Sequence, residues 1–238
     1  MASINKADIL KSVDYAKKNQ LFNKLNNIYD NLPKGECTGC GSCCMESVGI
    51  NLIEFLNIYN YLQDKDELRK KSLGRIMDYY FMEFMKKNCC PFKDENNRCE
   101  IYEVRPLNCR LFGHWKKEDY NKNLNDITEK NKQYKNIMKG KYGFDISDEV
   151  VNYKIKYCED FIPENRYLSK SERLSFADDL MVLDSRLFTK GIIDIGIVEY
   201  FIDSLLNQNI SYNIKVRISK EQHISKRTIG RLKRMLIK

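Results

Sequence analysis

The chain has 238 residues, of which 42% are hydrophobic and 31% are charged, and its formal net charge is +8. This composition excludes a disordered tail, and the length allows a core that needs no disulfides. The first 18 residues are polar and charged. We therefore expect neither a secretory signal nor a membrane span, and predict a cytoplasmic protein. In that reducing compartment nine cysteines indicate metal ligation or redox chemistry.

Helical periodicity is the main pattern along the chain. Apolar residues spaced three or four apart predict helices over residues 9–32, 51–62, 65–87, 169–191, 194–206 and 225–237. Two starts have capping-box spacing, Asn51 with Glu54 and Ser169 with Glu172. Residues 116–141 are rich in Lys and Asn, which indicates a solvated, partly helical connector without a packed face.

A short stretch near the C-terminus has a different period. Apolar and polar residues alternate over 210–218, which predicts a half-buried strand. Since the sequence offers no second strand, pairing with another copy of the chain is one expectation. The expected fold is mainly α, an irregular helical bundle with cysteine-rich metal-binding loops and this minor β element. We expect a cysteine-cluster domain with an N-terminal helix over residues 1–165, and a helical extension with a basic C-terminal strand and helix over 166–238.

The excess positive charge lies at the C-terminal end. Residues 214–238 contain nine Lys or Arg and one acid, Glu221, so the rest of the chain is neutral overall. A tail of this kind can dock on nucleic acid or another polyanion, and such binding depends steeply on salt. No recognised nucleic-acid motif accompanies it.

The first cysteine segment, CTGCGSCC at residues 37–44, places four cysteines in eight residues. A CxxC interval lets a loop curl so that both sulfurs reach one metal or cluster. Gly39 and Gly41 suit such a loop, because it needs unusual backbone angles. The run begins like that of a ferredoxin, but Ser47 stands where the fourth cysteine would be, so a further ligand must come from elsewhere.

A second cysteine segment, residues 88–115, contains Cys89, Cys90, Cys99 and Cys109, and Cys158 follows later. This number exceeds what one four-coordinate site can take. It favours a multinuclear site, an iron–sulfur cluster with extra ligands, or two metals. His114 is either an added ligand or, as we expect, an ordinary packed residue. The helices over 51–87 form an antiparallel pair in this prediction, which brings the two cysteine segments together at one end of the bundle.

The flanks of these cysteines resemble the YkgJ-like cysteine-cluster family, a zinc- or iron-chelating domain named for its CxxCxxCC motif. The similarity covers about residues 35–115 and runs through CP, C-x-IY, RP and CR-x-F in CPFKDENNRCEIYEVRPLNCRLFG. It implies metal chelation by Cys37, Cys40, Cys43, Cys44, Cys90, Cys99 and Cys109, and we include Cys158 as a candidate ligand. Cys89 departs from the motif and is expected to be a spare thiol.

The two arginines of the motif, Arg105 and Arg110, are expected to balance thiolate charge or to hold an anionic ligand or cofactor. The cysteine arrangement also looks similar to that of the flagellin lysine methylases, longer proteins thought to carry an iron–sulfur cluster. This similarity implies a methylase-like modifying enzyme as one alternative. No catalytic residue is assigned.

Two functions from different classes remain open at this point. In the leading hypothesis a cytoplasmic protein binds iron as a [4Fe–4S] cluster, with a redox, modification or metal-handling task on an unidentified protein or small-molecule substrate. In the other hypothesis, zinc only stabilises the fold of a binding module, and the basic tail of this module binds nucleic acid or a protein partner.

Overall fold

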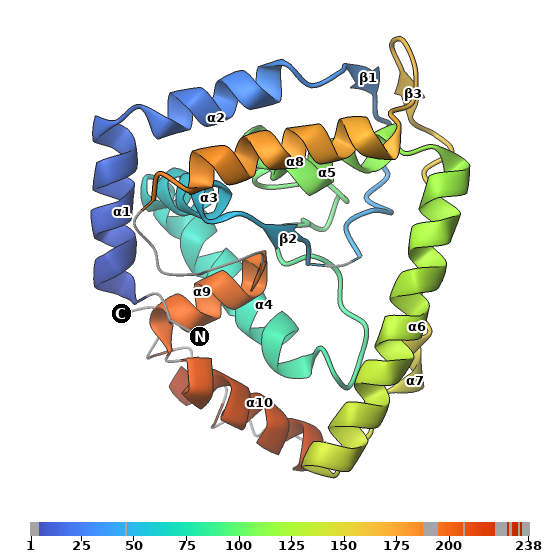
Figure 1. The fold of residues 1–238 in the computed structure, drawn as a ribbon. Coiled ribbons are helices and arrows are strands. Elements are labelled where there is room, and N and C mark those ends of the chain that lie inside the picture. Colours follow the sequence, from blue (N-terminus) through green and yellow to red (C-terminus); the bar gives the residue numbers. More distant parts are fainter. Residues whose placement is uncertain are drawn as a thin grey trace.

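A computed structural model describes residues 5–45, 47–187, 195–206 and 208–221 and, nearer the C-terminus, residues 228, 230–232 and 234. The described chain is mainly α-helical, as predicted (Figure 1). Its α-helices are α1 (Lys6–Lys18), α2 (Leu21–Asp30), α3 (Leu52–Gln63), α4 (Asp66–Met82), α5 (Leu107–Leu111), α6 (Lys117–Tyr142), α7 (Asp148–Val151), α8 (Lys170–Asp184), α9 (Ile197–Leu205) and α10 (Gln208–Glu221). Two short 3-10 helices are η1 (Tyr102–Val104) and η2 (Phe112–His114). Within the described ranges, no helix combines the length and the apolar character needed to cross a membrane.

Among the described residues, the strands form two small antiparallel pairs. Strand β1 (Gly35–Glu36) pairs with β3 (Ile162–Pro163), and β2 (Gly49–Ile50) pairs with β4 (Ile195–Gly196). Each pair joins a flank of the first cysteine segment to a part of the chain that lies more than a hundred residues later. The strands therefore hold this segment in place from both sides.

The main hydrophobic core forms where helices from the two halves of the sequence meet. In Figure 1, α4 crosses the centre of the molecule, α2 and α8 run along one edge, and α6 runs along another. Helix α4 packs against α9 and α10, and α2 packs against α8. Phe55 of α3 stacks on Tyr200 of α9, with ring centroids 4.8 Å apart. The predicted division near residue 165 stays a prediction.

Several predicted helices are confirmed with their starts. Asn51 and Glu54 form a capping box at the beginning of α3, and Ser169 and Glu172 form another at the beginning of α8. Helix α4 covers most of the predicted 65–87, and α9 covers most of 194–206. Helix α8 ends at Asp184, and the glycine expected to close it, at position 191, lies outside the described residues.

The single helix predicted over residues 9–32 is wrong in one respect, because the chain turns between α1 and α2. Gln20 adopts a left-handed backbone conformation with φ of 54°. The side-chain amide of Asn19 donates to the Tyr15 carbonyl at 2.9 Å, which satisfies a backbone group at the end of α1. Apolar spacing continues across the break, so periodicity alone could not show it.

The connector predicted over 116–141 is a continuous helix. Helix α6 spans 26 residues and ends at Gly143, whose φ of 71° is typical of a helix C-terminus. Its ends are anchored by Tyr120 and Met138, which are 6% and 1% exposed. The expectation of a segment without a packed face is therefore wrong at both ends of this helix.

The strand predicted over 210–218 is also wrong, because these residues form α10. Ser211, Lys215, Val216, Ile218 and Ser219 are buried, and their spacing is that of one helix face. The buried Lys215 ammonium pairs with Glu83 of α4. The prediction failed because the three polar residues on the buried face were assigned to the solvent-facing side. The predicted helix 225–237 lies largely outside the described residues.

Candidate metal centre

The two cysteine segments meet around a cavity of about 330 Å³. Six cysteines line it, namely Cys37, Cys43, Cys44, Cys90, Cys99 and Cys109. The other lining side chains are mainly apolar, and no His, Asp or Glu of the described chain is among them. Cys40, Cys89 and Cys158 lie outside this lining. We call this space the cysteine cavity.

The first cysteine segment reaches the second through its glycines and its backbone. Gly39 and Gly41 have φ of 71° and 70°, the left-handed conformation expected for them. A Cβ at Gly41 would lie 3.0 Å from the Asn97 carbonyl oxygen, so only glycine allows this close approach. The Cys90 N–H donates to the Cys44 carbonyl at 2.9 Å. The prediction that the segments come together is confirmed by these contacts.

The second segment folds into a tight loop between Cys90 and Cys99. Lys93 and Cys99 form an isolated antiparallel bridge, and Asp94 Oδ1 accepts from the Arg98 N–H at 2.7 Å. Arg75 of α4 donates to the Lys93 carbonyl at 3.2 Å and pairs with Glu100 beside Cys99. Helix α4 therefore fixes the loop that carries these two cysteines.

Cys109 is positioned by a buried carboxyl group on α3. Glu54 is 2% exposed, and its Oε1 accepts hydrogen bonds at 2.7 Å from both the Tyr29 hydroxyl and the Leu107 N–H. Leu107 begins α5, which carries Cys109. Burial raises the pKa of Glu54, and the hydrogen bonds that it accepts oppose this shift. The network connects α2 and α3 to the helix that presents Cys109.

Cys158 lies on the outer side of the first cysteine segment. The β1–β3 pair aligns Glu36 with Ile162 and so brings the segment after Cys158 alongside the first cysteine loop. The Phe161 ring occupies space that a Cβ at Gly35 or Gly113 would fill, at 2.2 and 2.3 Å. This packing anchors the segment that follows Cys158.

His114 packs against the same aromatic ring. Its imidazole contacts Phe161 edge to face, with centroids 4.6 Å apart, and the residue is 3% exposed. Burial lowers the pKa of His114. His114 does not line the cysteine cavity, which agrees with the expectation of an ordinary packed residue.

The thiols at the cavity have raised pKa values. Burial is the main cause for Cys109, for Cys99 and for Cys90, whose pKa rises to about 12. A hydrogen bond with Cys44, followed by burial, raises the pKa of Cys43. These thiols stay protonated unless a cation compensates the charge of the thiolates, and a bound metal supplies such compensation.

The outer cysteines show a different balance. Hydrogen bonding with Ser42 lowers the pKa of the exposed Cys40. Burial raises the pKa of Cys158, and neighbouring Cys40 and Cys37 raise it further. The electrostatic influence among these three thiols shows that Cys158 lies near the outer end of the first segment.

The two arginines of the motif have different surroundings. Arg105 lines the cysteine cavity, its guanidinium lies 3.8 Å from the Tyr102 ring centroid, and its buried Nε has no hydrogen-bond partner. Arg110 lies 4.0 Å from the Tyr29 ring centroid and donates to the carbonyls of Arg105 and Glu103. Arg105 therefore faces the thiols, and Arg110 holds the turn that presents them.

The donor set fits a thiophilic metal, but the coordination shell is not closed. Six thiols line one apolar cavity together with Arg105, whose buried Nε has no hydrogen-bond partner. Within the described part of the chain, however, no three His, Cys, Asp or Glu side chains are arranged so that they could hold a metal ion. Ligation of one metal by these cysteines would require the sulfurs to move closer together, and metal binding would then be coupled to ordering of the two loops.

The supporting residues Glu54, Tyr29 and Phe161 were missed from the sequence. Glu54 had been interpreted only as part of a capping box, although a lone carboxylate stands in the otherwise uncharged run LIEFLNIYNYLQ. That isolated charge on an apolar helix was the available signal. Nothing comparable marks Phe161, because its role depends on two glycines that are far away in the sequence.

Comparison with known proteins agrees with this site. Residues 36–135 match the CxxCxxCC family, described as a "Putative zinc- or iron-chelating domain". The resemblance predicted from the cysteine spacing is thereby confirmed, and the matched segment extends into α6. This part of the chain is therefore similar to a domain described as chelating zinc or iron. No solved structure matches the chain.

Proposed function

We propose that this CxxCxxCC domain binds iron as a [4Fe–4S] cluster in the cysteine cavity, in a cytoplasmic protein with a redox, modification or metal-handling task. The observation that carries the proposal is the gathering of six thiols around a cavity of about 330 Å³, with no His, Asp or Glu among the described lining residues. One zinc ion needs four ligands, whereas a cluster with its sulfides occupies more space and is bound by thiolates. When bound, such a cluster supplies one-electron transfer.

The residues of this chain would contribute in three ways. Cys43, Cys90, Cys99 and Cys109 are the proposed inner ligands, because burial or a neighbouring thiol keeps them neutral until a cation arrives. Arg105 would offset the negative charge of the thiolates. Cys37, Cys40, Cys44 and Cys158 remain proposed ligands at the outer side of the site.

The experiment is anaerobic purification of the full chain followed by metal and sulfide analysis. We expect a brown protein with iron and acid-labile sulfide in equal amounts, about four of each per chain. A colourless protein with stoichiometric zinc would instead establish a zinc centre. Zinc binding would preserve the chelating role and overturn the iron–sulfur assignment.

A matched pair of variants tests whether the cysteine cavity is the site. Cys90→Ala should lose most of the metal, whereas Cys89→Ala should keep it, although these residues are adjacent. Cys90 lines the cavity and Cys89 is exposed outside it. Equal metal content in the two variants would place the metal elsewhere.

A further inference from the structure

Two of the candidate ligands, Cys40 and Cys158, lie outside the lining of the cysteine cavity. Cys40 is exposed and Cys158 is partly buried. Cys37, which precedes Cys40 in the first CxxC interval, lines the cavity instead. We call Cys40 and Cys158 the outer pair. Chemistry at the outer pair therefore takes place beside the cysteine cavity and not within it.

The antiparallel ladder of β1 and β3 leads to both members of the outer pair. Glu36 is paired with Ile162, and the Lys34 carbonyl accepts from the Glu164 N–H at 3.0 Å in the same register. The outer pair stands four residues after Glu36 and four residues before Ile162, which are equivalent places on the two loops that leave the ladder. Opposed residues of an antiparallel pair have Cα atoms about 4.5–5.5 Å apart, a separation that a disulfide spans.

Electrostatic influence supports the same placement. Burial is the main cause that raises the pKa of Cys158, and of the two thiols that raise it further, Cys40 contributes more than Cys37. Hydrogen bonding with Ser42 lowers the pKa of Cys40, and Asp160, two residues after Cys158, acts against this shift. Because such influence falls with distance, these effects place Cys40 nearer to Cys158 than Cys37 is.

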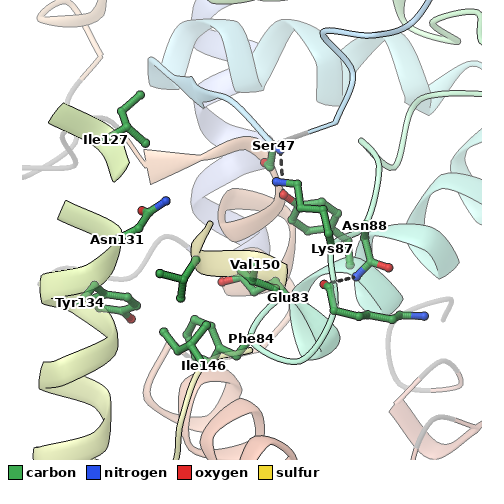
Figure 2. Close-up of a pocket in the computed structure, with 13 residues that line it drawn as sticks. Ser47, Glu83, Phe84, Lys87, Asn88, Ile127, Asn131, Tyr134, Ile146 and Val150 are labelled. Carbon is green, nitrogen blue, oxygen red and sulfur yellow. Dashed lines mark hydrogen bonds between the residues drawn. The ribbon is translucent and has the colours of Figure 1, made fainter. Parts of the chain in front are cut away.

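The two ends of the first cysteine segment are held differently. At its inner end, the Ser47 N–H donates to the Tyr79 hydroxyl of α4 at 2.9 Å, beside the cavity between α4 and α6 (Figure 2). At its outer end, a Cβ at Gly39 would meet no atom of the described chain within 4 Å. The outer end therefore has room to adjust around Cys40, while the inner end is fixed against α4.

We propose that the outer pair forms a reversible disulfide under oxidising conditions, while the inner ligands of the cysteine cavity keep the metal. In the reduced protein both thiols stay available at the outer side of the metal site. Only the retention of metal rests on the proposed function, because the disulfide itself lies outside the cavity. Cys158 also lies outside residues 36–135, so the family match assigns it no role.

The oxidant is a low-molecular-weight disulfide. The Cys40 thiolate attacks one sulfur of the oxidant, which forms a mixed disulfide and releases one thiolate. The Cys158 thiolate then attacks the Cys40 sulfur, which forms the protein disulfide and releases the second thiolate. The two released thiolates take up the two protons of the outer pair. The pair loses two electrons and the oxidant gains them.

The test is anaerobic incubation of the metal-loaded full chain with glutathione disulfide, followed by peptide mass spectrometry and metal analysis. We expect the loss of two free thiols per chain, a cross-link between the peptides that carry Cys40 and Cys158, and unchanged metal content. Dithiothreitol should restore both thiols. The urea midpoint should be higher for the oxidised protein, because the cross-link closes a long loop and restricts the unfolded chain.

Variants distinguish the roles of the two cysteines. Cys158→Ser removes the thiol that resolves the mixed disulfide, so a glutathione adduct should accumulate on Cys40. Cys40→Ser should abolish the cross-link without such an adduct at Cys158. Cys89→Ser is the matched control, because Cys89 is also exposed and lies outside the cysteine cavity. This control should form the same cross-link as the unchanged protein.

Three results would overturn the proposal. The first is the absence of a cross-link, the second is a disulfide that contains Cys37 in place of either member of the outer pair, and the third is release of metal when the cross-link forms. Mapping of the cross-link in the unchanged protein decides the first two even if a variant fails to fold. A protein that binds no metal before oxidation would contradict the proposed function instead, and the cross-link would still test the outer pair.

Discussion

Two buried regions of this protein balance their charges in opposite ways. In the cysteine cavity, Cys43, Cys90, Cys99 and Cys109 are held as neutral thiols, and Arg105 is the one cation that faces them from a half-buried position within the described chain. In the second region, Lys215 is 4% exposed, its ammonium pairs with Glu83, and its charge acts on the carboxyl groups of Glu199 and Asp203.

The second region, which we call the Lys215 cluster, consists of Lys215 with Glu83, Glu199 and Asp203. Lys215 pairs with Glu83, and its Nζ lies 4.2 and 4.3 Å from the ring centroids of Tyr80 and Phe84. The Ser211 hydroxyl donates to Asp203 at 3.1 Å. Here the Lys215 ammonium finds its counter-charge within the fold, in the Glu83 carboxylate, which indicates a structural role. In the cysteine cavity, by contrast, ionisation of several thiols would need more positive charge than Arg105 supplies, and a bound metal could supply it.

The strongest test of this contrast is removal of an inner thiol. Cys109→Ala should lose most of the bound metal, and with it the stabilisation that metal binding gives, about 4 kcal/mol at a thousandfold excess over Kd. Urea unfolding with and without metal measures both effects. If Cys109→Ala and Cys37→Ala retain the metal content of the unchanged protein, the cysteine cavity is not the metal site.

A substitution in the Lys215 cluster should lower stability without changing metal content. Lys215→Met leaves the Glu83 carboxylate without its partner and should lower the free energy of unfolding by about 3 kcal/mol, while metal content stays the same. Lys220→Met is the control, because Lys220 is exposed on the same helix. A destabilisation shared equally by the two variants would show that Lys215 is not a buried anchor.

The sequence predicts one of these regions and misses the other for a physical reason. The cysteine segments carry local signals, since CxxC spacing and glycines at left-handed positions act within a few residues. The capping boxes at Asn51 and Ser169 are equally local and fix helix starts. Such features depend on residues that are close together in the sequence, so they can be predicted before the fold is known.

The Lys215 cluster depends on partners that lie far apart. Glu83 and Lys215 are separated by more than a hundred residues, and a buried lysine looks like a solvent-facing residue in the sequence. The alternation over 210–218 therefore predicted a strand where α10 forms. The Glu54 network could not be predicted from the sequence for the same reason, because Tyr29 and Leu107 belong to separate elements.

A substitution at Arg105 tests whether this cation stabilises the thiolates that would bind the metal. Arg105→Gln should lower metal affinity by about 10- to 100-fold, the usual range for a group that supports metal ligands. Competition with a chelator measures the affinity. Arg98→Gln is the matched control, because Arg98 also lines the cavity but is exposed to solvent. If both variants lose the same affinity, Arg105 acts only through its positive charge and has no specific role beside the thiols.

The Lys215 cluster also predicts a pH dependence of stability. Burial, followed by repulsion from Glu83, raises the pKa of Glu199 from 4.5 to about 7, and burial raises that of Asp203 to about 6. A carboxyl group with a raised pKa in the folded state contributes stability that is complete below its unfolded pKa. This contribution is lost as pH rises through about 7 for Glu199.

Glu199→Gln should remove part of that dependence. Between about pH 4.5 and 7, the unfolding free energy of the unchanged protein should fall relative to that of the variant, by an amount on the order of 1 kcal/mol. Urea unfolding of both metal-loaded proteins at several pH values gives the difference directly. Parallel pH profiles would show that Glu199 ionises normally and that the cluster is not desolvated.

The smallest effect on stability and metal content is expected for a substitution at Cys89. This result tests whether burial separates the metal ligands from the other cysteines. Cys89 is exposed and lies outside the cysteine cavity, so its side chain is in contact with water and is not packed among the buried thiols. Cys89→Ala should change the unfolding free energy by less than about 0.5 kcal/mol, as expected for a surface substitution, and should leave metal content unchanged. If metal were lost in Cys89→Ala, an exposed cysteine outside the cavity would contribute to metal binding. Burial at the cysteine cavity could then no longer be used to identify the ligands.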